Sequence, residues 1–156
     1  MRSADEIPEI APSDIRLLIA ELAQCAEPRL RAALIALFLR HPEYADFVPT
    51  ILPFLDSAAA ERLQHYYTAA VYLQRFWYST LRIYLGDFPL LKNFFGQAVY
   101  QLPPADEKFG ESGLRALAIY FQRITGFDWL STYDSAIDLL LKQLSLENHV
   151  HVNDPG

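Results

Sequence analysis

The sequence predicts an all-α protein, an irregular bundle of about six helices arranged around one long central helix. Apolar residues recur every three to four positions along nearly the whole chain, which is the spacing of a helix face. Of the 156 residues, 52% are hydrophobic, enough for the core of a single domain. We expect one domain over residues 1–156, with its core at 14–146 and loose termini at 1–11 and 147–156.

Prolines mark the first two helices. Pro12 begins the first helix, and Pro28 begins the second, because proline suits the first turn of a helix. The second helix runs to Arg40 and ends before the next proline. Residues 42–55 hold three prolines, so we expect short helical turns there instead of one helix.

The longest periodic stretch predicts a helix over 57–85, which ends at the capping candidate Gly86. Its apolar face is wide, which predicts a central helix that several neighbours contact. We expect one helix, or one bent near Ser79-Thr80, where side-chain hydroxyls compete for backbone carbonyls. Trp77 should be its best-buried large residue. The apolar face comprises Leu63, Tyr66, Ala70, Leu73, Trp77, Leu81 and Tyr84.

The second half of the chain predicts an irregular stretch followed by two helices. Scattered prolines and glycines over 86–111 favour loops, with a short helix at 89–95. A further helix begins near Ser112 and ends at Gly126. The last helix covers about 129–145.

The N-terminal third of the chain carries a repeat-like order of residues. The order is Leu17-Leu18, then Glu27-Pro28, then Leu30-Arg31-Ala32-Ala33-Leu34, then Phe47-Val48-Pro49. Residues 14–55 thus resemble one and a half units of a HEAT-type repeat, with its acidic-Pro turn and its apolar-Arg-x-x-Ala helix start. The period does not continue beyond Ser57. The resemblance implies a protein-binding surface and no catalytic residue.

Charge, hydropathy and cysteine content indicate which classes of partner and which cellular location to expect. The formal net charge of −6 disfavours general nucleic-acid binding, because phosphate affinity needs clustered cations. No stretch approaches 18 uncharged apolar residues, so we expect no membrane span. The single cysteine cannot form an intrachain disulfide, and the acidic N-terminus lacks the pattern of a signal peptide. We therefore expect a cytoplasmic protein.

The sequence contains no convincing catalytic or metal-binding constellation. Gly110-Glu111-Ser112-Gly113 is close to a nucleophile elbow, but Leu114 follows where that motif needs glycine, so we expect Ser112 to cap a helix. His149 and His151 have a spacing that metals use, without further ligands around them. We expect no cofactor, no metal site and no catalytic residue, and we favour a protein that is not an enzyme.

The best candidate surface lies along one edge of the predicted long helix. The edge combines aromatic residues with arginine, a composition enriched in the cores of protein interfaces. We expect it to bind a protein partner or a second copy in a homodimer, unless other helices of the chain cover it. The edge comprises Tyr72, Arg75, Phe76, Ser79, Arg82 and Ile83.

The alternative is a small enzyme or ligand-binding protein with an apolar pocket between the long helix and the last helix. Gln74 carries an amide within the apolar face, where a buried polar group needs hydrogen-bond partners. The two hypotheses differ in geometry, since a pocket requires a concave site around Gln74 and an adaptor requires an exposed apolar patch. The pocket candidates are Tyr66, Gln74, Tyr84 and Tyr133.

Overall fold

The computed structural model describes residues 11–152, and over that range the protein is all-α, as predicted, with no strand. Short 3-10 helices at Pro42–Phe47, Leu52–Phe54 and Glu107–Gly110 lie between the longer elements. The α-helices are α1 (Pro12–Gln24), α2 (Pro28–Arg40), α3 (Val48–Ile51), α4 (Ser57–Phe76), α5 (Tyr78–Leu85), α6 (Glu111–Thr125) and α7 (Trp129–Val152).

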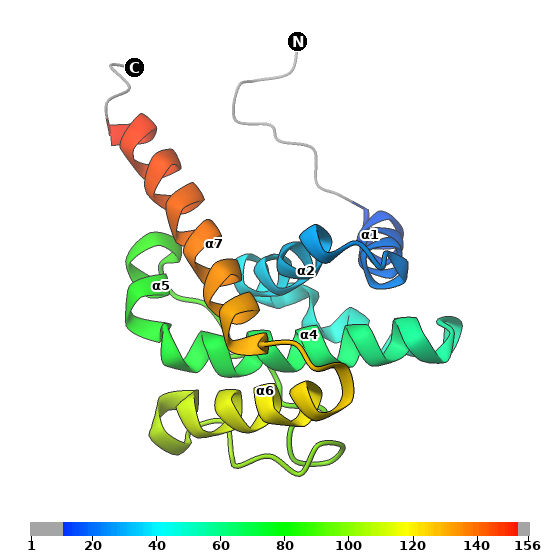
Figure 1. Cartoon of the computed structure of the whole chain (residues 1–156). Helices are drawn as coiled ribbons and strands as arrows, with labels where there is room; N and C mark the ends of the chain where they lie inside the picture. The colour runs from blue at the N-terminus through cyan, green and yellow to red at the C-terminus, as the bar shows by residue number, and fades with distance from the viewer. Residues whose placement is uncertain (1–10, 153–156) are drawn as a thin grey trace.

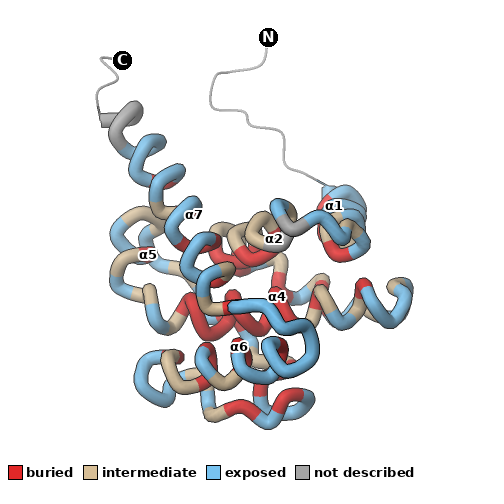
Figure 2. Tube along the Cα trace, viewed as in Figure 1, coloured by how far each residue is buried: buried red, intermediate tan, exposed pale blue. Residues whose placement is uncertain are grey.

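Helix α4 packs against neighbours on several sides. In Figure 1, α1 and α2 lie above α4, α6 lies below it, and α7 crosses in front before it runs to the upper left. Every residue from His65 to Gln74 is buried, so this part of α4 has no solvent-facing stripe (Figure 2). A helix that is covered all round in this way must have partners on every face.

The predicted helix over 57–85 is interrupted at Trp77. Asp56 caps the start of α4, where its carboxylate accepts a hydrogen bond from the Ala59 amide at 2.8 Å, and Gly86 ends α5 with a φ of +72°. Between them, Trp77 leaves the helical conformation, and the break turns α5 toward α7 (Figure 1). The prediction of a bend near Ser79-Thr80 was therefore two residues late.

The prediction that Trp77 is the best-buried large residue was wrong. Trp77 is half-buried beside the break, because the chain changes direction there and the side chain no longer follows the α4 core face. The largest fully buried side chains are three tyrosines, Tyr67, Tyr72 and Tyr133.

Residues 86–106 have no helix, so the short helix predicted at 89–95 was wrong. The Gln74 side chain accepts a hydrogen bond from the Leu91 amide at 2.7 Å and donates one to the Pro89 carbonyl at 3.1 Å. Tyr72 donates to the Pro103 carbonyl at 2.6 Å. Backbone groups that a helix would pair internally are thus paired with side chains of α4.

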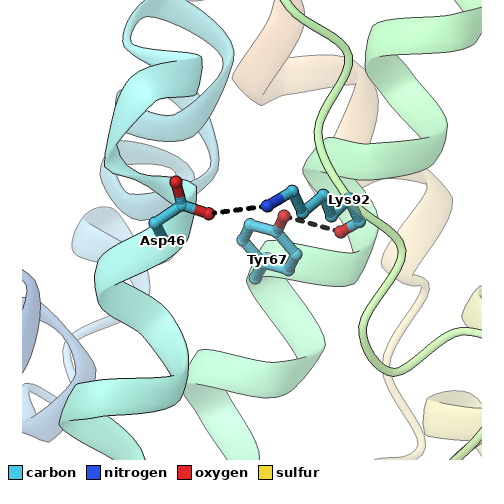
Figure 3. A network of polar contacts seen from close by, with 3 residues as sticks. All are labelled: Asp46, Tyr67 and Lys92. Carbon is cyan, nitrogen blue, oxygen red and sulfur yellow. Dashed lines mark hydrogen bonds and ion pairs between the residues drawn. The ribbon is translucent and has the colours of Figure 1, made fainter.

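A second tyrosine of α4 binds the irregular segment, at Lys92 (Figure 3). The Tyr67 hydroxyl donates to the Lys92 carbonyl at 2.6 Å, and the Lys92 ammonium lies 3.2 Å from the Asp46 carboxylate. Burial raises the pKa of Tyr67, so this hydroxyl keeps its proton and remains a donor. The contacts join the segment to α4 and to the 3-10 helix Pro42–Phe47.

Glycines allow α6 to approach α4 closely at Tyr72. A Cβ atom at Gly113 would overlap the Tyr72 ring, and one at Gly110 would overlap the Tyr72 carbonyl. Gly110 also has a φ of +90°, which favours glycine. The Gly-Glu-Ser-Gly sequence therefore serves helix packing, and Ser112 lies inside α6 without a capping hydrogen bond, contrary to the expectation.

Helix α7 is longer than predicted. It continues past 145 to Val152, so the expected loose segment is helical over 147–152, while 1–10 and 153–156 lie outside the described residues. Arg40 of α2 holds Glu147 of α7 at 2.6 Å within this extension. The backbone of His149 and His151 is part of the helix, and their side chains lie outside the described part.

Candidate functional site

One apolar hollow on the described part of the molecule is a groove formed by three helices. Helix α2 forms its floor, and α1 and α7 form its walls, with a cavity volume of about 470 Å³. We call it the α2 groove. It is lined by Leu18, Leu22, Arg29, Ala32, Ala33, Ala36, Leu37, Arg40, His41, Ala136, Leu139, Leu140 and Gln143.

The floor of the groove is apolar because α2 itself is composed almost entirely of apolar residues. Only three of its thirteen residues are polar, and all three are arginines. Leu34, Ile35, Phe38 and Leu39 are buried in the core. The alanines at 32, 33 and 36 are only half-buried and line the groove. An apolar helix at the edge of a domain has more apolar surface than one core contact can cover.

The walls carry leucines that remain open to solvent. Leu18 of α1 is 38% exposed and Leu139 of α7 is 53% exposed. Leu140 and Ala136 lie on the same wall and are buried against the core. Bulky leucines above a floor of alanines make a trough, since alanine leaves space that larger side chains would fill.

A second hollow extends the groove along α7. It has a volume of about 370 Å³ and shares three residues, Arg29, Ala32 and Leu139, with the α2 groove. Its other lining residues are Ser131, Thr132 and Ser135 of α7, which add hydroxyl groups. The groove therefore passes from an apolar middle to a polar end.

The charged residues of the α2 groove are both arginines. Arg40 pairs with Glu147 at 2.6 Å, and this hydrogen bond lowers the pKa of the Glu147 carboxyl. Arg29 has no ion-pair partner among the described residues. His41 lies at the Arg40 end, 3.2 Å from the Glu43 carboxylate. The described lining contains no carboxylate, although the net charge of the whole chain is −6.

The six residues of the predicted edge of the long helix differ in exposure. Phe76 and Ile83 are 46% and 79% exposed, and Ser79 and Arg82 are exposed as well. Arg82 pairs with Asp87 at 3.0 Å. These four side chains are exposed to solvent.

The chain itself covers the other two edge residues, which is the alternative that the sequence left open. Tyr72 is fully buried against Gly113, because the irregular segment and α6 cover that side of α4. Arg75 is half-buried and donates to the Val71 carbonyl and to the Gln74 amide oxygen. Burial lowers the pKa of Arg75.

The predicted pocket residues do not surround one cavity. Gln74 is fully buried, and its amide is occupied by the backbone at Pro89 and Leu91. Tyr84 is half-buried on α5. Tyr66 and Tyr133 are buried, and the rings of both contact a buried histidine of α4.

That histidine, His65, lies in an aromatic cluster. Its ring stacks on Phe121 with 3.5 Å between centroids, and its Nε2 lies 2.6 Å from the Tyr133 hydroxyl. Burial raises the pKa of Tyr133 well above its usual value. A small hollow of about 220 Å³ opens beside His65 and Trp129. His65, Phe121 and Tyr133 come from three different helices that are far apart in the sequence. No local sequence pattern could therefore predict that they lie together.

Across the side chains the structure describes, no three His, Cys, Asp or Glu side chains converge on a point. Within 11–152, no helix combines the length and apolar character that a membrane crossing needs.

Comparison with known proteins identifies no relative of this chain. No protein-family model matches this sequence, and no curated protein or solved structure matches it. The resemblance of residues 14–55 to a HEAT-type unit therefore stays an expectation.

Proposed function

We propose that the protein is a non-catalytic interaction module, an adaptor or regulatory partner, that binds a helical segment of another protein in the α2 groove. The observation that carries the proposal is the open apolar trough itself. It has a floor of alanines and walls with exposed leucines, and no described segment of the chain covers it. A cytoplasmic location, expected from the single cysteine, is part of the proposal.

The dimensions of the groove suit an α-helix. Its floor runs from Arg29 to Arg40, eleven residues along α2, which corresponds to roughly 16 Å or three turns. Alanines on the floor allow a second helix axis to come close, since interaxial distance depends on the side chains at the contact. An amphipathic helix that lays an apolar face into such a trough is a recurring mode of recognition.

The exposed part of the predicted edge supports a second, smaller contact. Phe76 and Ile83 offer apolar surface on the α4–α5 side of the molecule, but no concave surface surrounds both of them among the described hollows. Interface energy concentrates where anchors enter pockets. The groove is therefore the primary site in this proposal.

Site-specific photo-crosslinking tests the proposal. A photoreactive phenylalanine analogue replaces Leu139 in the groove, Leu90 in the irregular segment, or Ile83 on the edge, and each variant is irradiated in its native host. Leu90 is the matched control, because it is also a leucine and is 52% exposed, against 53% for Leu139.

We expect light-dependent adducts with another protein from position 139 and few from position 90. Adducts that form from position 83 but not from 139 would place the interface on the predicted edge and contradict the groove. Adducts at equal yield from 139 and 90 would show nonspecific proximity, and the groove would lose its support.

A further inference from the structure

We infer that the α2 groove selects an amphipathic helix that carries carboxylates at both ends of its apolar face, about three turns apart. The inference rests on the proposed function and names the chemistry of its partner. It follows from the positions of Arg29 and Arg40, the only arginines or lysines in the described lining.

The two arginines lie on one face of α2 and at opposite ends of the trough. A separation of eleven residues is close to three full helical turns, so their side chains leave α2 in nearly the same direction. A helix docked along the floor would meet Arg29 near one end and Arg40 near the other. Residues ten to twelve positions apart on the partner would face both.

The one unpaired charge in the described groove lining, that of Arg29, is opposite in sign to the net charge of the whole protein. The chain has a net charge of −6, yet the described lining contains two arginines and no carboxylate, and only Arg40 is paired, with Glu147 outside the lining. Complementary charge at the rim steers association and sets register, while the apolar contact holds the complex. An acidic partner is thus favoured at this one surface of an otherwise acidic molecule.

One of the two positions already holds a carboxylate. Arg40 binds Glu147 of α7 at 2.6 Å, with both side chains partly exposed. A guanidinium group has five donors and accommodates more than one carboxylate. Arg29 has no such partner among the described residues, and its charge is therefore available to a ligand.

A symmetric dimer fits the groove poorly. Two copies that met groove to groove would bring Arg29 and Arg40 against the same two residues of the partner copy, since a two-fold interface pairs each patch with itself. Like charges across an interface disfavour association. The occupant we infer is a different protein with an acidic amphipathic helix.

A display selection on the full chain tests the inference. The probe is a library of peptides about six turns long, with a fixed leucine and alanine face and flanking positions randomised among Glu, Gln and Lys. Binders are selected on the wild-type chain and counted again on Leu139→Glu, which places a charge in the groove, and on Leu90→Glu as the matched surface control.

We expect enriched peptides to carry Glu at two positions ten to twelve residues apart, to bind Leu90→Glu, and to lose binding to Leu139→Glu. Gln at both positions should weaken binding roughly 2- to 30-fold, as two partly exposed ion pairs predict. On the double variant Arg29→Glu/Arg40→Glu, whose fold is checked by circular dichroism, the enriched residues should change from Glu to Lys.

Each other outcome overturns the inference, and two of them separate it from the proposed function. Groove-dependent peptides with no preference for Glu would refute the charge selection and leave the groove as a helix-binding site. A library with no groove-dependent binders would refute both. A wild-type dimer in sedimentation that Leu139→Glu converts to monomer would assign the groove to a second copy.

Discussion

The two sides of α4 differ in the structure that covers them and in how much apolar surface stays exposed. On one side, residues 86–106 have no regular structure, yet together with α6 they cover α4, because side chains of α4 pair with their backbone. On the other side, α1, α2 and α7 are regular helices, and the surface they form is left open. Irregular backbone can be buried only with polar partners, whereas regular helices satisfy their own backbone and leave apolar side chains for another molecule.

The largest expected effect tests the covered side. Tyr72→Ala should lower the free energy of unfolding by about 3–5 kcal/mol, the range for deleting a large core aromatic side chain. The ring fills the space left by Gly113, and the hydroxyl holds the Pro103 carbonyl. Phe76→Ala, one turn later and 46% exposed, is the matched control and should lose about 1 kcal/mol or less. Urea denaturation measures both, and equal losses would place Tyr72 at the surface.

A smaller effect is expected where the amide of Gln74 holds the irregular segment. Gln74→Leu preserves the approximate volume but leaves the Leu91 amide and the Pro89 carbonyl without partners. We expect a loss of roughly 2 kcal/mol, within the range for stranding buried polar groups. Hydrogen exchange at the Leu91 amide should accelerate. Unchanged exchange would show that the segment does not depend on Gln74.

The buried tyrosines predict a pH dependence. Burial raises the pKa of Tyr67 in the folded protein above its usual value of 10.0, so the unfolded chain releases this proton at a lower pH than the folded one. The unfolded state then binds fewer protons above pH 10, and stability falls as pH rises, by up to about 1.4 kcal/mol per pH unit for one tyrosine. Tyr67→Phe should reduce that slope between pH 10 and 11. An identical slope in the variant would mean that the hydroxyl ionises equally in both states.

Much of the helical pattern was predictable, because local residues set it. Pro12 and Pro28 begin α1 and α2, Asp56 caps α4, and Gly126 ends α6 with a φ of +80°. The three prolines within 42–55 correctly predicted short turns. Each of these signals acts within a few residues of its own position.

The predictions failed where contacts between residues far apart in the sequence determine burial or the path of the chain. The sequence left open whether Tyr72 is covered, because its covering residues, Pro103 and Gly113, lie 31 and 41 positions further along the chain. Trp77 has no proline or glycine beside it, so no local signal marks the break. The α2 groove did have a signal, namely that Ala32 and Ala36 extend the apolar surface of α2 beyond the face toward the core.

The smallest expected change in stability is for a substitution in the α2 groove, on the open side of the molecule. Leu139→Glu should change the free energy of unfolding by no more than about 0.5 kcal/mol, since the side chain is more than half exposed. A much larger loss would mean that Leu139 belongs to the core. The groove would then be part of the fold and not a spare surface.

The most direct measurement of the central claim compares partner recovery for two matched variants. Wild type, Leu139→Glu and Leu90→Glu are purified from the native host at native expression levels, and the bound proteins are quantified by mass spectrometry, with circular dichroism as the folding control. We predict a folded Leu139→Glu that loses the proteins recovered by both wild type and Leu90→Glu. Recovery of the same proteins by all three chains at equal yield would contradict the assignment of binding to the α2 groove.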